Sequence, residues 1–585
     1  RLLRTSPTVV MNLAIALFAS CTAGAAFTAG SAVASNGRRV VSRASMATAR
    51  RAGLLAAGFV VVLPNMVFVP GLVGRLIGTE HGTFDWWATS RVIPNSAAIT
   101  EFPAWSLLFG DVHPHVMGLP LLLTVLVLCL AWYRSLIERR SAQSLALAVA
   151  VGVLIGLVRA TNTWDYPLAL AAPLTCVAVA LVRRGNWRVA ARDALVVGAG
   201  VVLAWAPYAW RGEVYDAGVQ PVTQRTPWVS WADQWAFFAA CTALVALPVV
   251  WRWARRHVST SPTVLRSVRR GHFIALAGGV AAVGVFLLAP SRSTQVTCVV
   301  LAGLAGAAAV IGRRAKTVSS LGCALMSVGW LAIAVIEQYS VKNDDGRMNT
   351  VFKGWYQAWL LLAVGSAVSL IVLVRSQALA SSQAPRLYRR AGFAFVAFAG
   401  VVAVAFAVLA TPVRLEDRLS PDRLSLDGLG YFDSDLRYSD TDRPLADDLP
   451  LLKWLQANVH GIVPIAEAPG DDYIWSSRFS TMAGLPTPIG WPYHERQQKR
   501  DYSTLVDQRV ADMKELYTTV DPARVAELLA RYRLRYIAFG LVEQRLSVDR
   551  TGATLLASTC VSEVYRSGGL FIAEVDRECL GSSVR

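Results

Sequence analysis

Long apolar runs, separated by short polar or basic segments, recur along the chain from its start to about residue 411. A helix of roughly 17–25 apolar residues is long enough to cross the hydrocarbon core of a bilayer, and these runs have about that length. The pattern therefore predicts about twelve transmembrane helices, at residues 9–34, 52–73, 116–133, 142–158, 167–182, 195–210, 234–250, 272–290, 296–311, 319–338, 354–374 and 391–411.

From residue 412 onward the apolar runs become shorter and are mixed with charged residues. Helices are predicted at 449–459 and from Asp521-Pro522 to 531, strands at 461–466 and 536–539, and a hairpin of 561–565 with 570–575. The predicted fold is mainly α: a polytopic helix bundle over residues 1–411, followed by a C-terminal α/β domain over residues 412–585.

The composition supports a membrane protein. The chain has 585 residues, of which 54% are hydrophobic and only 16% are charged, and this balance excludes an ordinary soluble protein. The net charge of +18 does not indicate nucleic-acid binding, because the arginines form short clusters between the apolar runs. Clusters of this kind are typical of topology signals.

The basic clusters alternate with loops that carry few cations. They lie at 38–51, 134–140, 183–192, 252–270, 313–316 and 375–390, and the positive-inside rule predicts that they face the cytoplasm. The loops at 74–115, 159–166, 211–233, 291–295 and 339–353 then face outward, as does the domain from 412. We therefore expect a multi-pass plasma-membrane protein whose C-terminal domain is extracytoplasmic.

Cysteine placement agrees with this orientation. Six of the eight cysteines lie in predicted spans, whereas Cys560 and Cys579 lie in the outward domain. An oxidising compartment predicts a disulfide between these two, with two free thiols as the alternative.

The segment 100–120, TEFPAWSLLFGDVHPHVMGLP, places four ionisable residues beside a predicted span: Glu101, Asp111, His113 and His115. Ionisable groups at this depth are costly and usually functional, so we take these four as candidate catalytic residues. In an extended segment alternate side chains point the same way, so Asp111, His113 and His115 could bind a divalent metal ion or form a proton relay. Alternatively, the histidines hydrogen-bond to neighbouring loops.

Other outward segments contain candidate substrate-binding residues. Arg91 could pair with Asp85 or Glu101, or act on substrate. In the segment RATNTWDYP, Arg159 could bind a phosphate or pair with Asp165, and Asn162 lies between them.

The loop at 339–353 is the outward loop richest in charge. Arg347 and Lys353, with Asp345 and Asn349, could hold a lipid phosphate or diphosphate. The alternative is a solvated loop whose cations extend to the membrane surface.

In the C-terminal domain the candidates follow predicted strand ends, where binding residues commonly lie. They are Glu467, Arg478, His494 and Glu495. The alternative is a packed loop that holds the domain together. The sequence contains no P-loop, HExxH, GxSxG or dinucleotide-binding fingerprint, which disfavours an ATP-driven pump and the common hydrolases.

Five stretches occur in an order that resembles a known family: FDWWATSRVIPN, EFPAWSLLFGDVHPHVMGLP, RATNTWDYP, DDGRMNTVFKGWYQAW, and EAPGDDY with GLPTPIGWPYHERQQKR. They resemble the large multi-pass "YYY" membrane proteins, a domain-of-unknown-function family named for a Tyr-Tyr-Tyr motif. That family resembles the GT-C glycosyltransferase superfamily, whose members take a sugar from a polyprenyl-phosphate carrier at the outer membrane face and place an acidic catalytic residue in the first outward loop.

The resemblance implies that the chain lacks the family's N-terminal part. The Tyr-Tyr-Tyr motif is not in the sequence, and VVMNLAIALF corresponds to the span that follows it. The main catalytic carboxylate could then lie upstream, with Asp111 or Glu101 in support.

The leading hypothesis is a GT-C-like glycosyltransferase. A transporter or lipid flippase, and a non-catalytic scaffold for envelope assembly, stay as alternatives.

Overall fold

A computed structural model describes residues 5–35, 42–184, 187–210, 218–258, 292–315, 319–342, 344–375, 383–418, 425–433, 437, 443–498 and 502–583. The chain divides into two compact units: Ile15–Asp417, here called the helical unit, and Arg1–Ala14 with Arg418–Arg585, here called the sheet unit. The division falls at the end of a long helix, Gln383–Arg418, rather than at residue 411.

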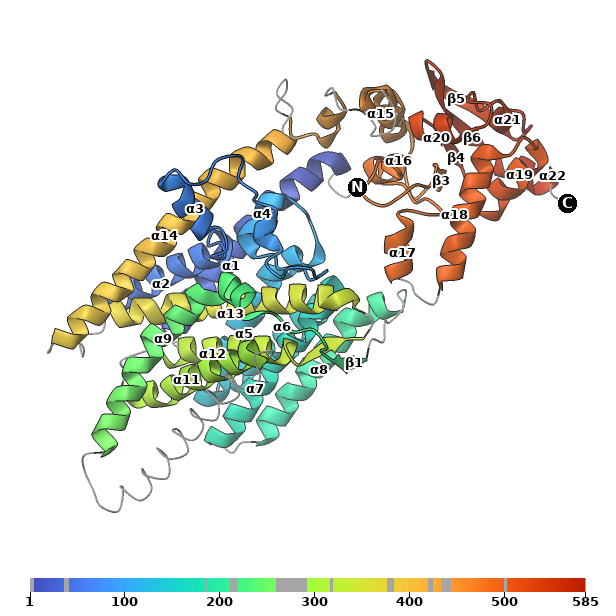
Figure 1. Ribbon diagram of the computed structural model, residues 1–585. Helices are drawn as coiled ribbons and strands as arrows, with labels where there is room; N and C mark the ends of the chain where they lie inside the picture. Colours follow the sequence, from blue (N-terminus) through green and yellow to red (C-terminus); the bar gives the residue numbers. More distant parts are fainter. Residues whose placement is uncertain are drawn as a thin grey trace. The chain divides into compact units, whose positions relative to one another are not determined.

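The helical unit contains long helices joined by short irregular segments (Figure 1). Its elements are α1 (Pro7–Ala34), α2 (Arg43–Val61), α3 (Val69–Leu76), η1 (Ala88–Ser90), α4 (Pro103–Phe109), α5 (Pro114–Glu138), α6 (Ser141–Thr161), η2 (Thr163–Asp165), α7 (Tyr166–Arg184), α8 (Trp187–Ala209), β1 (Val219–Pro221), α9 (Trp228–Val258), α11 (Ser293–Ala315), α12 (Ser320–Ile336), β2 (Tyr339–Val341), η4 (Asp345–Arg347), α13 (Met348–Arg375) and α14 (Gln383–Arg418).

Within the described residues, eight helices are long and apolar enough to cross a membrane: α1, α5, α6, α8, α9, α11, α13 and α14. The structure supports a multi-pass membrane protein, but the count of twelve is not confirmed. The predicted span at 52–73 is interrupted, because α2 ends at Val61 and α3 begins only at Val69. Pro64 lies in this break, and proline cannot continue a helix without losing a hydrogen bond. The predicted span at 272–290 lies outside the described residues.

Helix α13 is the most enclosed of these helices, because 89% of its apolar stretch is buried. It packs against α2, α9, α12 and α5. Its approach to α12 requires small residues: a Cβ on Gly365 would lie 2.7 Å from the carbonyl oxygen of Gly322. Because α13 is enclosed by other helices, the polar side chains in its first turns contact several neighbouring segments.

A short antiparallel ribbon joins two loops of the helical unit. β1 pairs with β2 so that Gln220 faces Ser340. The ribbon brings the segment before α9 beside the segment between α12 and α13, although the two are far apart in the sequence.

The sheet unit contains a four-stranded sheet of order β3-β4-β6-β5, in which β3 and β4 are parallel and the other pairs antiparallel. Its elements are η6 (Gly428–Asp433), η7 (Leu445–Asp448), α15 (Leu449–Asn458), β3 (Ile465–Ala466), α16 (Arg478–Ala483), α17 (Pro492–Gln498), α18 (Ser503–Thr518), α19 (Pro522–Arg531), β4 (Tyr536–Phe539), α20 (Leu541–Leu546), α21 (Ala553–Leu556), β5 (Val561–Ser567), β6 (Leu570–Val575) and α22 (Arg577–Ser583).

Several elements of this unit lie where the sequence predicts them. α19 begins at Pro522 with Asp521 as its N-cap, and β4 covers residues 536–539. β3 is shorter than predicted, because pairing begins only after Pro464, which has no backbone N–H for the ladder. Cys560 and Cys579 are joined by a disulfide, with their Cα atoms 5.5 Å apart.

Side-chain alternation along the strands gives the sheet two apolar faces. Ile537, Phe539 and Phe571 belong to one buried cluster, whereas Ala538 and Ile572 belong to another. Helices cover both faces, so the loops that follow the strands are held on a packed core.

Candidate functional site

Three ionisable side chains from different segments meet in the helical unit: Glu101, His115 and Lys353. The Nζ atom of Lys353 lies 3.1 Å from Nδ1 of His115, and Nε2 of His115 lies 3.6 Å from Oε2 of Glu101. Their exposed fractions are 8% for Glu101, 4% for His115 and 6% for Lys353. A buried chain of a carboxylate, an imidazole and an ammonium group therefore links the segment before α4 to the starts of α5 and α13.

The local sequence explains how Glu101 and His115 are placed at the two ends of a short helix. α4 begins at Pro103, a position where proline is favoured, with Phe102 as its N-cap, and Gly110 ends the helix in the left-handed conformation. Pro114 then begins α5, and His115 is its second residue. The short helix between two breaks returns the chain, so Ser106 Oγ donates a 2.7 Å hydrogen bond to Glu101.

Asp111 and His113 form a pair that solvent can reach. Oδ2 of Asp111 lies 2.5 Å from Nδ1 of His113, and the two side chains are 38% and 50% exposed. The ring of His113 lies 5.2 Å from the ring of His115. The exposed carboxylate–imidazole pair is therefore next to the buried chain.

The expected extended arrangement of Asp111, His113 and His115 is not present. His113 is the N-cap of α5, whereas His115 is helical and contacts Lys353. The part of the chain that the structure describes holds no group of three or more His, Cys, Asp or Glu side chains that could hold a metal ion. The metal hypothesis gains no support from this geometry.

Asp165 contributes a second buried carboxylate. Gln357 on α13 donates a 2.9 Å hydrogen bond to its Oδ1 and a 2.7 Å bond to the carbonyl oxygen of Trp164. Oδ2 of Asp165 has no hydrogen-bond partner within the described residues and faces Gly118 on α5, where a Cβ would overlap it. Lys353 and Gln357 are four residues apart on one face of α13, so that face contacts two separate loops.

Burial and charge set the protonation of these carboxyl groups. Burial raises the pKa of Glu101, against the opposing effects of the Ser106 hydrogen bond and the nearby positive charges of Arg91 and Lys353. Burial raises the pKa of Asp165 to about 7. For Asp111, burial acts in the same direction, but the hydrogen bond and charge of His113 outweigh it and lower the pKa. Asp111 is therefore ionised at neutral pH.

Arg91, Arg159 and Asn162 border this region. The guanidinium of Arg159 lies between the rings of Tyr166 and Trp205, at 4.6 and 4.2 Å from their centres. Arg91 lies over Trp87 and donates to Ser90, and burial lowers its pKa. Asn162 ends α6, and its side-chain nitrogen has no hydrogen-bond partner among the described residues.

Arg347 forms a different buried pair. Its guanidinium lies 3.4 Å from Glu337 and donates a 2.9 Å hydrogen bond to Thr226, which itself donates to Glu337. Asn349 donates to Asp344, and Asp345 is the first residue of η4. Arg347 therefore joins the end of α12 to the segment before α9. Lys353 instead contacts His115.

Residues 1–362 match the model of the family described as uncharacterized membrane proteins, DUF2298. The chain belongs to this family. No curated protein matches the chain. The DUF2298 match includes Glu101, His115, Asp165 and Lys353, so the buried chain and its neighbours lie within the family region.

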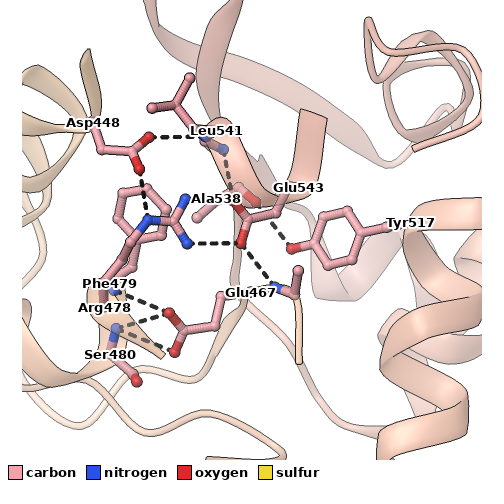
Figure 2. Close-up of polar contacts among 11 residues, drawn as sticks. Asp448, Glu467, Arg478, Phe479, Ser480, Tyr517, Ala538, Leu541 and Glu543 are labelled. Carbon is pink, nitrogen blue, oxygen red and sulfur yellow. Dashed lines mark hydrogen bonds and ion pairs between the residues drawn. The ribbon is translucent and has the colours of Figure 1, made fainter. Parts of the chain in front are cut away.

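Beyond the DUF2298 match, Arg478 is the centre of a buried ion network in the sheet unit (Figure 2). It donates to Asp448 at 2.6 Å and to Glu543 at 2.7 Å, and all three side chains are fully buried. Glu467 accepts from the backbone nitrogens of Phe479 and Ser480, and burial raises its pKa to about 7. The network joins the starts of α15, α16 and α20.

His494 contacts two residues on another loop. Its Nδ1 lies 2.9 Å from Oδ1 of Asp472, and its Nε2 lies 3.0 Å from the hydroxyl of Tyr473. Glu495 follows on α17. Within the helical unit the predicted candidates thus form one group around His115 and Lys353 and another around Arg347, and within the sheet unit one around Arg478 and another around His494.

The sequence indicates the candidate residues themselves more often than the residues that they contact. Gln357, Ser106, Asp448, Glu543, Asp472 and Tyr473 all contact predicted residues. Gln357 could have been found from its position four residues after Lys353 on a predicted helix. No signal in the sequence relates Asp472 to His494, because the contact depends on how two loops fold.

Proposed function

We propose that this protein is an integral membrane glycosyltransferase of GT-C type, which transfers a sugar from a polyprenyl-phosphate donor to an acceptor hydroxyl at the outer membrane face. The observation that supports it most is the exposed Asp111–His113 pair beside the buried Glu101–His115–Lys353 chain. This arrangement places a base that solvent can reach, His113, near the positive charge of Lys353.

In this proposal His113 is the general base. Asp111 accepts the Nδ1 proton of His113 and orients the ring, so Nε2 is available to take the proton of the acceptor hydroxyl. The acceptor oxygen forms a bond to the anomeric carbon of the sugar, while the bond from that carbon to the phosphate oxygen breaks. The polyprenyl phosphate leaves with the bonding electron pair, and the positive charges of Lys353 and Arg91 stabilise it.

Placement of the groups along the helices supports the sidedness. His115 starts α5 and Lys353 lies near the start of α13, whereas Arg139 and Arg140 follow α5 and Arg375 ends α13. Opposite ends of these helices therefore carry the polar site and the basic clusters. The positive-inside rule assigns the site to the outer face.

A transporter is a weaker reading of the same groups. Ion-coupled carriers place ionisable residues near the middle of the membrane, often on broken helices. Here Glu337 follows the last residue of α12 and Asp165 precedes the first of α7. Groups at helix ends suit chemistry at the membrane surface better than passage through the membrane.

The test is transfer of a labelled sugar from polyprenyl-phosphate donors by the full-length protein in lipid vesicles. We expect His113→Ala to lower the rate about 100-fold, the usual contribution of a general base. His81→Ala is the matched control, since His81 is another exposed histidine of the predicted outward loops, and it should leave the rate unchanged. Failure of the folded protein to use any such donor, or full activity of His113→Ala, would overturn the proposal.

A further inference from the structure

Arg159, on the last turn of α6, holds its guanidinium between two aromatic rings. The guanidinium carbon lies 4.6 Å from the centre of the Tyr166 ring, at the start of α7, and 4.2 Å from that of Trp205 on α8. Gly156, one turn earlier, lets α6 approach α8, because a Cβ there would lie 2.6 Å from the carbonyl oxygen of Val201. We call Arg159, Tyr166 and Trp205 the Arg159 site.

The hydrogen-bond donors of Arg159 are not used inside the described part of the protein. There its side chain forms no hydrogen bond and no ion pair, and Asp165, the carboxyl group nearest in sequence, instead accepts from Gln357. Nε of Arg159 is buried without an acceptor, whereas the terminal nitrogens are not buried, so a ligand can reach them. Aromatic rings attract a cation, but they do not replace the acceptors that the N–H groups of a guanidinium need.

The surroundings place this site at the membrane surface. Both α6 and α8 begin beside a basic cluster, whereas Arg159 and Trp205 lie near their other ends. Tyr208 and Trp210, about one turn beyond Trp205, are 51% and 92% exposed. Exposed Tyr and Trp at the ends of spans are typical of the headgroup region of a bilayer. At this level the anionic acceptors that a bilayer offers are the phosphate groups of its lipids.

We propose that the Arg159 site binds the phosphate group of a membrane lipid, in the leaflet away from the basic clusters. A guanidinium is a rigid planar fork whose N–H groups match two phosphate oxygens, and the phosphate compensates for a cation that has no carboxylate partner in the described residues. The two rings already hold the fork, so binding costs little side-chain freedom. Val202 and Leu203, exposed on α8, offer apolar surface to acyl chains, which favours a lipid over free phosphate.

A purely structural role for Arg159 is the main alternative. Stacking alone would join α6, α7 and α8 through the faces of the guanidinium, but it would leave the edges without acceptors at a depth where an unpaired charge is costly. The site shares no residue with the Asp111–His113 pair or the Glu101–His115–Lys353 chain. The inference therefore does not depend on the proposed transferase activity.

The experiment measures lipid binding to the full-length protein in detergent micelles by native mass spectrometry. The probes are phosphatidylglycerol and a polyprenyl phosphate, with diacylglycerol, which has chains but no phosphate, and inorganic phosphate, which has no chains. We expect at least one phosphate lipid to bind, and Arg159→Gln to weaken its binding about tenfold, as loss of charge-assisted hydrogen bonds would. The phosphate lipid that binds more tightly identifies the source, a bilayer lipid or a polyprenyl carrier.

Arg75→Gln is the matched control, because Arg75 lies in the last turn of α3 on the same predicted side but already donates to the carbonyl oxygens of Gly82 and Thr83. It should bind the lipid like the wild type. Added lipid should raise the melting temperature of the wild type and Arg75→Gln more than that of Arg159→Gln. His113→Ala should keep lipid binding, which separates this result from failure of the transferase proposal.

Equal binding by Arg159→Gln, equal binding of diacylglycerol, or equally tight binding of inorganic phosphate would overturn the proposal. If Arg159→Gln does not fold, the wild type is labelled with the phosphate lipid that binds, carrying a photoreactive group on its headgroup. Labelling of peptides that contain residues 159–166 or 205–210 supports the site, and labelling confined to other peptides overturns it.

Discussion

Lys353 and His115 are neighbours in space, with Nζ and Nδ1 only 3.1 Å apart, although 238 residues separate them in the sequence. The contact joins the second turn of α13 to the first turn of α5. Nδ1 is the acceptor in this contact, since an ammonium group has donors only. Nε2 therefore carries the proton that faces Glu101. The relationship fixes both the tautomer of a buried histidine and the position of a buried cation.

Replacing Lys353 with Met should abolish sugar transfer and destabilise the helical unit. Removal of one partner from a buried ionic group typically costs about 3–5 kcal/mol, because the opposite charge stays buried without compensation. Here Glu101 and Asp165 would lose the nearby cation. Thermal unfolding and vesicle transfer assays measure the two effects. Lys342→Met, at an exposed lysine, should change neither, and full stability of Lys353→Met would contradict the interpretation.

Gly118→Ala should disturb Asp165. The new methyl group would overlap Oδ2 of Asp165, so the η2 segment must move away from α5. We expect a loss of about 1–3 kcal/mol, typical of overpacking in a close contact. Gly303→Ala on α11 is the control, since a Cβ there meets no atom within 4 Å, and its stability should stay equal or rise. Equal unfolding temperatures for the two variants would show that Gly118 is not in close contact.

Glu467 predicts a specific pH dependence. Its pKa is about 7 in the folded protein and 4.5 in the unfolded chain, because burial disfavours the charged form. Between those values the folded state keeps a proton that the unfolded state has lost, so stability falls as pH rises from about 4.5 to about 7 and is level above that. The total loss is about 3 kcal/mol at most.

The measurement is the unfolding temperature of wild type and Glu467→Gln at about pH 5 and about pH 8. Gln keeps an oxygen to accept from Phe479 and Ser480 but cannot ionise. The wild type should lose more stability than Glu467→Gln across this range. A parallel pH dependence of the two proteins would assign the effect to another group.

Arg478→Met should be severe, because Asp448 and Glu543 are fully buried and would both lose their cation. The expected loss is about 3–5 kcal/mol. Arg496→Met gives the comparison: its pair with Asp507 is exposed, and pairs of that kind contribute little. Chemical denaturation followed by tryptophan fluorescence measures both. Similar losses for the two variants would mean that burial of the Arg478 network is not what makes it important.

The sequence predicts the helical elements well because apolar length is a strong, local signal. It overestimates the segment 52–73, where the apolar residues continue through Pro64 but the helix does not. The strand at Tyr536–Phe539 and the helix at Pro522–Arg531 are predicted for the same reason: their signals lie within the segment itself.

The site is predicted less completely, because partner choice depends on tertiary structure. Arg347 and Lys353 lie six residues apart in the same charged loop and look equivalent in sequence. Arg347 lies before α13 in a left-handed backbone conformation and pairs with Glu337, whereas Lys353 lies on the helix and reaches His115. The start of α13 falls between the two residues and separates their roles, and the sequence does not show which neighbour each side chain meets.

The enclosure of α13 has a consequence for biosynthesis. The ribosome makes α2, α5, α9 and α12 before α13, yet all of them pack against it. Until residues 348–375 enter the bundle, the groove that will receive them contains Glu101, His115 and Asp165 without their cation and without Gln357. We therefore expect the earlier helices to stay loosely associated in the membrane until α13 inserts, and this late step to bring Lys353 and Gln357 to their partners.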